Sequence, residues 1–142
     1  MRKLTILALL ISGTAMLAFA QSGKITGKLT YPSDMIPQDL VLCVKATSLY
    51  NEPVYCSNDR VSRLRAAKVS FRLSLGSATY EASLPAGTYL IYARTGQMPG
   101  IDAYYNDFIK CGMTVRCRSK RPIPVKVRPR QTTRGITVGD FW

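Results

Sequence analysis

The chain contains no histidine, and this absence excludes several classes of enzyme. Without histidine there is no Ser-His-Asp or Cys-His nucleophilic site, no His-x-x-Glu-His metalloprotease motif, and most catalytic zinc sites are excluded as well. Glutamate is scarce, with Glu52 and Glu81 alone. Nothing in the sequence pairs two acidic residues as the two carboxylates of a glycosidase. The sequence therefore predicts that the protein is not an enzyme.

Motifs for cofactors and metal ions are missing too. The chain has no glycine-rich phosphate-binding loop. Asp102 and Asp107 lack the alternating carboxylate spacing of an EF-hand calcium loop, so we expect them to be ordinary loop residues. We predict neither a cofactor nor a metal site.

Long hydrophobic runs are confined to the first residues. Arg2 and Lys3 precede an apolar run over 4–17, and residues 18–20, Ala-Phe-Ala, supply the small side chains that a signal peptidase recognises. The run is short for a membrane-spanning helix of about 20 residues, which favours a cleaved signal over a retained anchor. We predict a signal peptide at 1–20 and a single β-sandwich domain at 21–142. The mature protein would be periplasmic or secreted, without a transmembrane span.

Cysteines are few but even in number. All four, Cys43, Cys56, Cys111 and Cys117, follow the expected signal. An even count in an exported chain indicates two disulfides. Three pairings are open, and proximity favours Cys43–Cys56 and Cys111–Cys117. A four-thiolate zinc site is disfavoured because twelve and five residues separate these cysteines and no Cys-x-x-Cys pair exists.

Acidic residues are absent from a long C-terminal stretch. None lies between Asp107 and Asp140, whereas 110–134 holds nine basic residues. Without residues 1–20 the chain has 18 Lys and Arg against 8 Asp and Glu, a net charge of +10. Such a field attracts lipid head groups, phosphorylated glycans, acidic proteins or nucleic acid. The alternative is a solvated face that only keeps the protein in solution.

Alternation of apolar and polar residues predicts strands along most of the chain. Leu84-Pro85-Ala86-Gly87 indicates a strand end and a tight turn, with Pro85 fixing φ and Gly87 accepting a positive φ. Prolines at 122, 124 and 129 remove ladder donors, so the strand near 125 is expected at a sheet edge. The result is an all-β sandwich of seven or eight short antiparallel strands. The expected strands are 24–31, 40–46, 54–56, 69–75, 80–84, 88–94, 123–127 and 135–141.

Two stretches stay ambiguous in the sequence. Val61, Leu64 and Ala67 have helical spacing, so 57–68 is either one short helical turn or an exposed basic loop. Residues 102–109 are rich in aromatic side chains and form either a strand or an irregular platform.

Several motifs carry a family resemblance. These are the opening strand with Gly27, the core strand holding Cys43, the Leu84–Tyr89 turn, and a late Val-x-Val strand followed by Ile-x-Val. Together they resemble carboxypeptidase-regulatory-like and transthyretin-like (prealbumin-like) domains. The Tyr-Pro-Ser motif at 31–33 and Gly-Asp-Phe-Trp at 139–142 are similar to small exported bacterial proteins of this type. The resemblance covers most of 24–140 and implies a prealbumin-like or Ig-like sandwich with an adhesion, binding or accessory role. It supplies no catalytic residue.

The basic stretch contains the candidate binding residues. A disulfide would hold the loop between Cys111 and Cys117 at low entropy, so that its arginines meet phosphate or carboxylate groups without a large ordering cost. Tyr104 and Tyr105 precede the loop and are candidates to stack on sugars or a partner, with packing in the core as the alternative. The candidate anion-binding residues are Arg116, Arg118, Lys120 and Arg121.

The sequence therefore predicts an exported, non-enzymatic binding module of the cell envelope that docks an anionic envelope component or acidic protein. The alternative is an inhibitor or immunity protein of a secreted hydrolase, since rigid loops on a small sandwich suit that role. An acidic hydrolase would match the charge best. Nucleic acid is disfavoured as a partner because no recognised binding motif is present. The ligand and the oligomeric state are not predicted.

Overall fold

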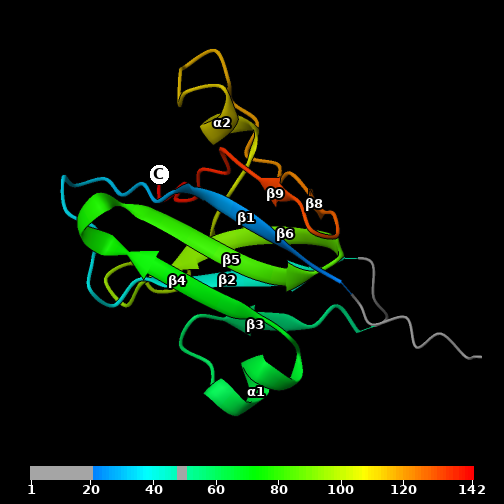
Figure 1. Cartoon of the computed structure of the whole chain (residues 1–142). Coiled ribbons are helices and arrows are strands. Elements are labelled where there is room, and N and C mark those ends of the chain that lie inside the picture. The colour runs from blue at the N-terminus through cyan, green and yellow to red at the C-terminus, as the bar shows by residue number, and fades with distance from the viewer. Residues whose placement is uncertain (1–20, 48–50) are drawn as a thin grey trace, which may run out of the picture.

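The computed structural model describes residues 21–47 and 51–142, so the expected signal peptide lies outside the described residues. The chain folds into two β-sheets (Figure 1). Sheet 1 has the strand order β4-β5-β1-β9, and sheet 2 has the order β3-β2-β6, with both β7 and β8 paired to β6. The strands of sheet 1 are β1 (Ser22–Lys28), β4 (Ser70–Ser74), β5 (Thr79–Pro85) and β9 (Thr132–Thr133). Those of sheet 2 are β2 (Val41–Ala46), β3 (Val54–Cys56), β6 (Gly87–Arg94), β7 (Ala103–Tyr104) and β8 (Val125–Val127).

The hydrophobic core lies between the two sheets. Ile25 and Leu84 from sheet 1 and Leu42, Val44 and Ile91 from sheet 2 are fully buried in one cluster. In sheet 1, Ile25 and Leu84 alternate with exposed or half-buried neighbours, as the two-residue period of a strand requires, whereas β2 and β6 of sheet 2 contain runs of three buried residues. This two-layer, sandwich-like arrangement confirms the mostly-β fold class. The described residues form nine strands instead of the seven or eight expected, because the two-residue strands β7 and β9 are additional and the expected strand at 135–141 is absent.

The connection between β5 and β6 differs from the expected turn. Pro85 ends β5 and Gly87 begins β6, but β5 lies in sheet 1 and β6 in sheet 2. The chain therefore crosses between layers instead of forming a hairpin, and Gly87 is not among the described residues with positive φ. The expectation of a positive φ at this glycine was wrong, because a crossover does not need the backbone of a tight hairpin turn. The Ala86 amide secures the bend by donating to the carbonyl of Gln21 at 2.9 Å.

The closing segment also differs from the expectation. We expected antiparallel strands throughout, but β9 pairs in parallel with β1, and Leu29 forms a parallel bridge with Val138. Residues 135–141 belong to no named strand, although Ile136 and Val138 are buried as expected. The segment packs so tightly on β1 that a Cβ at Gly27 would lie 1.8 Å from the carbonyl oxygen of Ile136. Only glycine therefore fits at position 27 without moving the closing segment.

Two short helices flank the sheets at opposite ends of the molecule (Figure 1). Residues 57–68, which were ambiguous in the sequence, contain the short helix α1 (Val61–Ala66). No residue of this helix is fully buried. Helix α2 (Asp107–Lys110) follows β7, so the stretch 102–109 is part strand and part helix. A 3-10 turn, η1 (Leu75–Ser77), joins β4 to β5. The strand near 125, β8, pairs with β6 alone among the named strands, in agreement with the expected edge position.

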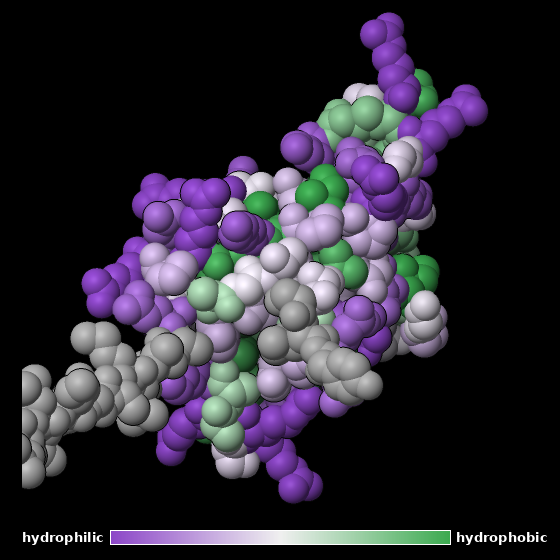
Figure 2. Space-filling view, turned by 90° about the vertical axis from the view of Figure 1, so that its right-hand side faces the viewer, coloured by the Kyte–Doolittle hydropathy of each residue, from purple (hydrophilic) through white to green (hydrophobic). Residues whose placement is uncertain are grey.

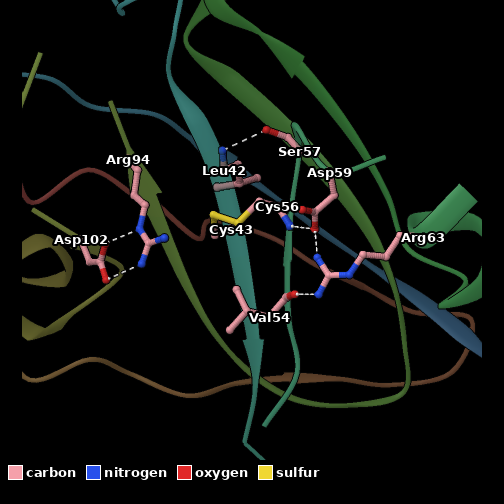
Figure 3. The surroundings of a disulfide bond; sticks show 9 residues. All are labelled: Leu42, Cys43, Val54, Cys56, Ser57, Asp59, Arg63, Arg94 and Asp102. Atoms are coloured by element: carbon pink, nitrogen blue, oxygen red, sulfur yellow. Dashed lines mark hydrogen bonds and ion pairs between the residues drawn. A yellow bond between two sulfur atoms is a disulfide. The ribbon is translucent and has the colours of Figure 1, made fainter. Parts of the chain in front are cut away.

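The disulfide between Cys43 and Cys56 joins β2 and β3, whose register places the two cysteines opposite each other. Figure 3 shows a polar clamp beside it. The Asp59 carboxylate accepts a hydrogen bond from the Cys56 amide at 2.8 Å and another from Arg63 at 2.5 Å. Arg63 also donates to the carbonyl of Val54 at 2.6 Å. The clamp therefore ties α1 to β3.

Replacing Arg63 with alanine should lower the free energy of unfolding by about 1 kcal/mol. The change removes an ion pair and a backbone hydrogen bond, but the Arg63 side chain is 51% exposed, so water weakens both. Arg65→Ala is the matched control, because Arg65 lies on the same helix and forms no side-chain ion pair among the described residues. Urea denaturation measures both variants. Equal stability of the two would show that the clamp does not stabilise the fold.

Candidate functional site

A buried polar network anchors α2 and the loop that follows it. Asn106 is 2% exposed and caps α2, where its side-chain oxygen accepts from the Ile109 amide at 2.9 Å. Its side-chain NH₂ donates to the Asp140 carboxylate at 2.6 Å. The other oxygen of Asp140 accepts from Lys120 at 3.3 Å, and Lys120 also donates to the carbonyl of Trp142. One amide and one carboxylate thus hold three segments together.

The loop from Lys110 to Arg121, called the disulfide loop below, projects from the sheets beyond α2 (Figure 1). Cys111 and Cys117 close it with a second disulfide, so both bonds have the pairing that proximity favoured. Gly112 and Met113 take positive φ values of 83° and 57° and reverse the chain inside the ring. Apart from Cys117, which is half-buried, every residue of the loop is exposed. In Figure 2 the same end carries hydrophilic side chains around a hydrophobic patch.

The four basic candidates have different roles in the structure. Arg116 and Arg118 are exposed and form no ion pair with a described residue. Lys120 is bound to Asp140 and lies 5.4 Å from the centre of the Phe108 ring, so it serves mainly to hold the loop. The Arg121 side chain is 84% exposed, and its Nε lies 3.9 Å from Oδ2 of Asp107, a long distance for an ion pair. Arg116, Arg118 and Arg121 therefore remain available to a ligand.

The two tyrosine candidates point to opposite faces of sheet 2. Tyr105 is 9% exposed and packs in the core, as the alternative interpretation of the sequence predicted. It is therefore not part of the binding site. Tyr104 pairs with Tyr92 across β7 and β6, their ring centres 4.8 Å apart. Its charged neighbours include Arg94 and Asp102. The structure does not join it to the arginines of the disulfide loop.

A second basic group continues the surface. Four exposed residues in and around β8 and β9 have no ion pair in the described part of the chain: Lys126, Arg128, Arg130 and Arg134. Of the nine basic residues from 110 to 134, only Lys120 and Arg121 have a carboxylate partner, which leaves seven without one. A hollow of about 370 Å³ lies beside β8, and its lining includes Lys126, Arg128 and Gln131. The cluster of basic residues in the sequence included these four, but the sequence did not show that they lie around β8 and β9.

Several described groups have pKa values shifted away from neutrality. Hydrogen bonds from the Thr95 hydroxyl and the Gly96 amide lower the pKa of Asp39, and burial raises the pKa of Tyr80, Tyr92 and Tyr104. Each of these shifts moves the group away from neutrality, whereas a general acid or base works best with a pKa near the operating pH. In the described ranges there is also no group of three or more Cys, Asp or Glu placed to hold a metal ion.

Comparisons with known proteins give no family for this chain. No protein-family model matches it, and no curated protein matches it. Among solved structures, a leucine-rich repeat protein from Bacteroides thetaiotaomicron aligns over 84% of this chain at 14% identity, with a TM-score of 0.38. The alignment spans only 14% of that protein's length. So weak a likeness carries no argument about fold or function.

Proposed function

We propose that this protein is an exported, non-enzymatic binding module that docks through its basic surface on an anionic component of the cell envelope. The observation that carries the proposal is the set of seven exposed basic side chains between 110 and 134 without an acidic partner. Unpaired like charges repel one another and destabilise the compact fold. An external anion that approaches them relieves this repulsion, so their favourable contribution is to binding.

The expected strength of docking follows from the charges. Each Lys or Arg near an anionic surface contributes about 1 kcal/mol, and the attraction falls off within about 8 Å at physiological ionic strength. The disulfide and the Asn106–Asp140–Lys120 network hold the disulfide loop in place before any ligand binds. Little conformational entropy is then lost on docking, which raises the affinity.

The compartment and the fold family are parts of the same proposal. Two disulfides are typical of proteins outside the reducing cytosol, and together with the expected signal peptide they support a periplasmic or secreted location. The described residues contain no helix that is long and apolar enough to cross a bilayer. The two-sheet architecture and the sequence motifs are consistent with a prealbumin-like domain, which we propose as the family.

Replacing Arg116 and Arg118 together with alanine should weaken binding to anionic vesicles by about thirtyfold, which corresponds to about 1 kcal/mol for each charge. Co-sedimentation with vesicles of phosphatidylglycerol and phosphatidylcholine measures the affinity, and an anionic glycan on beads tests a sugar ligand. The matched control is Arg60→Ala with Arg65→Ala, which removes the same charge at the α1 end. Raising NaCl from about 50 to about 500 mM should weaken binding of the unmodified protein strongly.

Two results would contradict the proposal. One is the absence of binding to every anionic vesicle and glycan at low salt. The other is an equal loss of binding in the Arg116/Arg118 variant and in the α1 control, because net charge alone would then be responsible and not this surface.

A second function is supported by the projecting disulfide loop. A rigid loop closed by a disulfide is suited to enter the cleft of a secreted hydrolase, and its charge would favour an acidic enzyme. A pull-down from envelope extract that returns one stoichiometric hydrolase, inhibited by the unmodified protein and not by the Arg116/Arg118 variant, would favour this function over surface docking.

A further inference from the structure

Exposed large apolar side chains gather at one end of the molecule. Of the six such residues among those described, Val61 and Ile101 lie elsewhere; of the other four, Met113 and Val115 lie in the disulfide loop, and Met35 and Trp142 line a groove with Met113. Those four are Met35 (76% exposed), Met113 (40%), Val115 (88%) and Trp142 (53%). The charge run in the sequence gave no sign of this patch, because its members come from three separate segments.

A groove shows that these segments are neighbours. Met35, Met113 and Trp142 line one groove of about 500 Å³ together with Tyr31 and Ile36. The groove is built on ordered parts of the fold, since the Tyr31 ring packs edge-on against Phe141 with their centres 5.1 Å apart. The carbonyl of Trp142 accepts the hydrogen bond from Lys120. The disulfide loop and the last residues are thus tied to each other beside the groove.

Basic side chains surround the exposed valine. Val115 lies inside the Cys111–Cys117 ring and is next to Arg116 in the chain. Val115 also lines a small hollow of about 320 Å³ with Phe108 and Arg118. We call the combination of Met35, Met113, Val115 and Trp142 with the basic residues of the disulfide loop the amphipathic end. Three carboxylates lie beside these positive charges: Asp34 lines the groove, and Asp107 and Asp140 are paired with Arg121 and Lys120.

This chemistry fits the surface of an anionic bilayer better than a protein partner. Contiguous exposed apolar patches on small proteins mark interaction sites. Tryptophan is enriched at the membrane–water interface, and arginine extends its charged group to phosphates while its stem covers apolar surface. A bilayer offers both a negative surface and an apolar layer beneath it, whereas a protein partner would need an acidic rim around a pocket shaped for Val115.

We propose that the amphipathic end docks on an anionic lipid bilayer, with Val115, Met113 and Trp142 entering the head-group region and the loop arginines on lipid phosphates. The inference rests on the proposed function and names its anionic surface. Binding then has two components, a salt-dependent attraction and a partition of apolar side chains that salt does not weaken.

The fluorescence of Trp142 provides a direct test, because it is the only tryptophan in the chain. With phosphatidylglycerol vesicles, the emission should shift to the blue and acrylamide should quench it less. Pure phosphatidylcholine vesicles should give little of either change. Dextran sulfate is the probe for an anion without an apolar layer, and it should bind without shifting the emission.

Substitution of Val115 tests the apolar component separately. Val115→Asn should lower the affinity for phosphatidylglycerol vesicles by about tenfold or more, as expected when a buried valine is lost. It should leave affinity for dextran sulfate within about twofold, because no charge is added. Val61→Asn is the matched control, since Val61 is 68% exposed on α1 at the other end of the molecule (Figure 1). Circular dichroism checks that both variants fold.

The failures of the two proposals are distinguishable. Vesicle binding with unchanged Trp142 emission, or with equal affinities for the Val115 and Val61 variants, would overturn insertion and leave docking on anions intact. Insertion would also be overturned if the protein bound dextran sulfate and phosphatidylglycerol vesicles with equal affinity and equal salt dependence. No binding to any anionic probe would overturn the proposed function itself.

Discussion

Replacing both Cys43 and Cys56 with serine is expected to lower the free energy of unfolding by about 3 kcal/mol. Closing a loop of this length removes about that much chain entropy from the unfolded state. Both cysteines are held in paired strands, so the folded state keeps the same order with or without the bond. Cys43 is fully buried, and an unpaired serine hydroxyl there adds to the loss.

Urea denaturation of the Cys43/Cys56 variant and of Cys111→Ser with Cys117→Ser measures the difference between the two bonds. The second bond closes a shorter, exposed loop, which regains motion in the folded state when it is reduced. Its removal should therefore lower global stability much less, while weakening binding to anionic vesicles. A loss of stability that is equal or greater for the Cys111/Cys117 variant would contradict this assignment.

Asn106→Ala is expected to lower the free energy of unfolding by about 3 kcal/mol. The variant loses the cap of α2, which contributes about 1 kcal/mol, and a hydrogen bond to a carboxylate, which contributes about 2 kcal/mol. Asp140 is 7% exposed, so one of its oxygens would lose a partner in a place that water hardly reaches. Among the described residues, Lys120 would remain the only partner of this carboxylate.

Asn58→Ala is the control for this substitution, because Asn58 is exposed and no side-chain hydrogen bond is found for it within the described chain. Chemical denaturation compares the two variants, and limited proteolysis reports the state of the disulfide loop. We expect Asn106→Ala to speed cleavage within 110–121 before the sheets unfold. Stability and cleavage indistinguishable from those of Asn58→Ala would refute the anchoring role of Asn106.

Strands that have one buried and one exposed face were predictable from the sequence. In β5, the alternation of Tyr80, Ala82 and Leu84 matches three buried positions, and the residues between them are half-buried. Such strands are specified locally because a shift of one residue would expose their whole apolar set. The disulfide pairing followed from proximity, since neighbouring strands in the chain also pair in sheet 2.

Features that depend on distant partners were not predictable. The parallel pairing of β9 with β1 joins segments from the two ends of the described chain, and no local pattern encodes it. The crossover at Pro85–Gly87 has the residues of a hairpin turn, but the strands on its two sides pair with β1 and β2 in different sheets. Local turn chemistry does not specify which sheet receives the next strand.

The basic residues of the candidate site were predictable from the sequence, but its exposed apolar residues were not. The basic run is contiguous in the sequence, so Arg116 and Arg118 were found at once. Met35, Met113 and Trp142 come from separate segments of the sequence, and only the fold brings them to one groove. Tyr104 and Tyr105 show how strand period decides availability, because adjacent residues point to opposite sides and one of them enters the core.

The position of β1 has a consequence for biosynthesis. Lys24 pairs with Ser83 on one side and with Thr132 on the other, so both neighbours of this first strand leave the ribosome long after it does. Until they arrive, its backbone amides and carbonyls are open to pairing with another chain. The nascent polypeptide thus passes through an interval in which a chaperone that binds extended segments has a target at its beginning. This interval closes only when β9 has been made and can pair with β1.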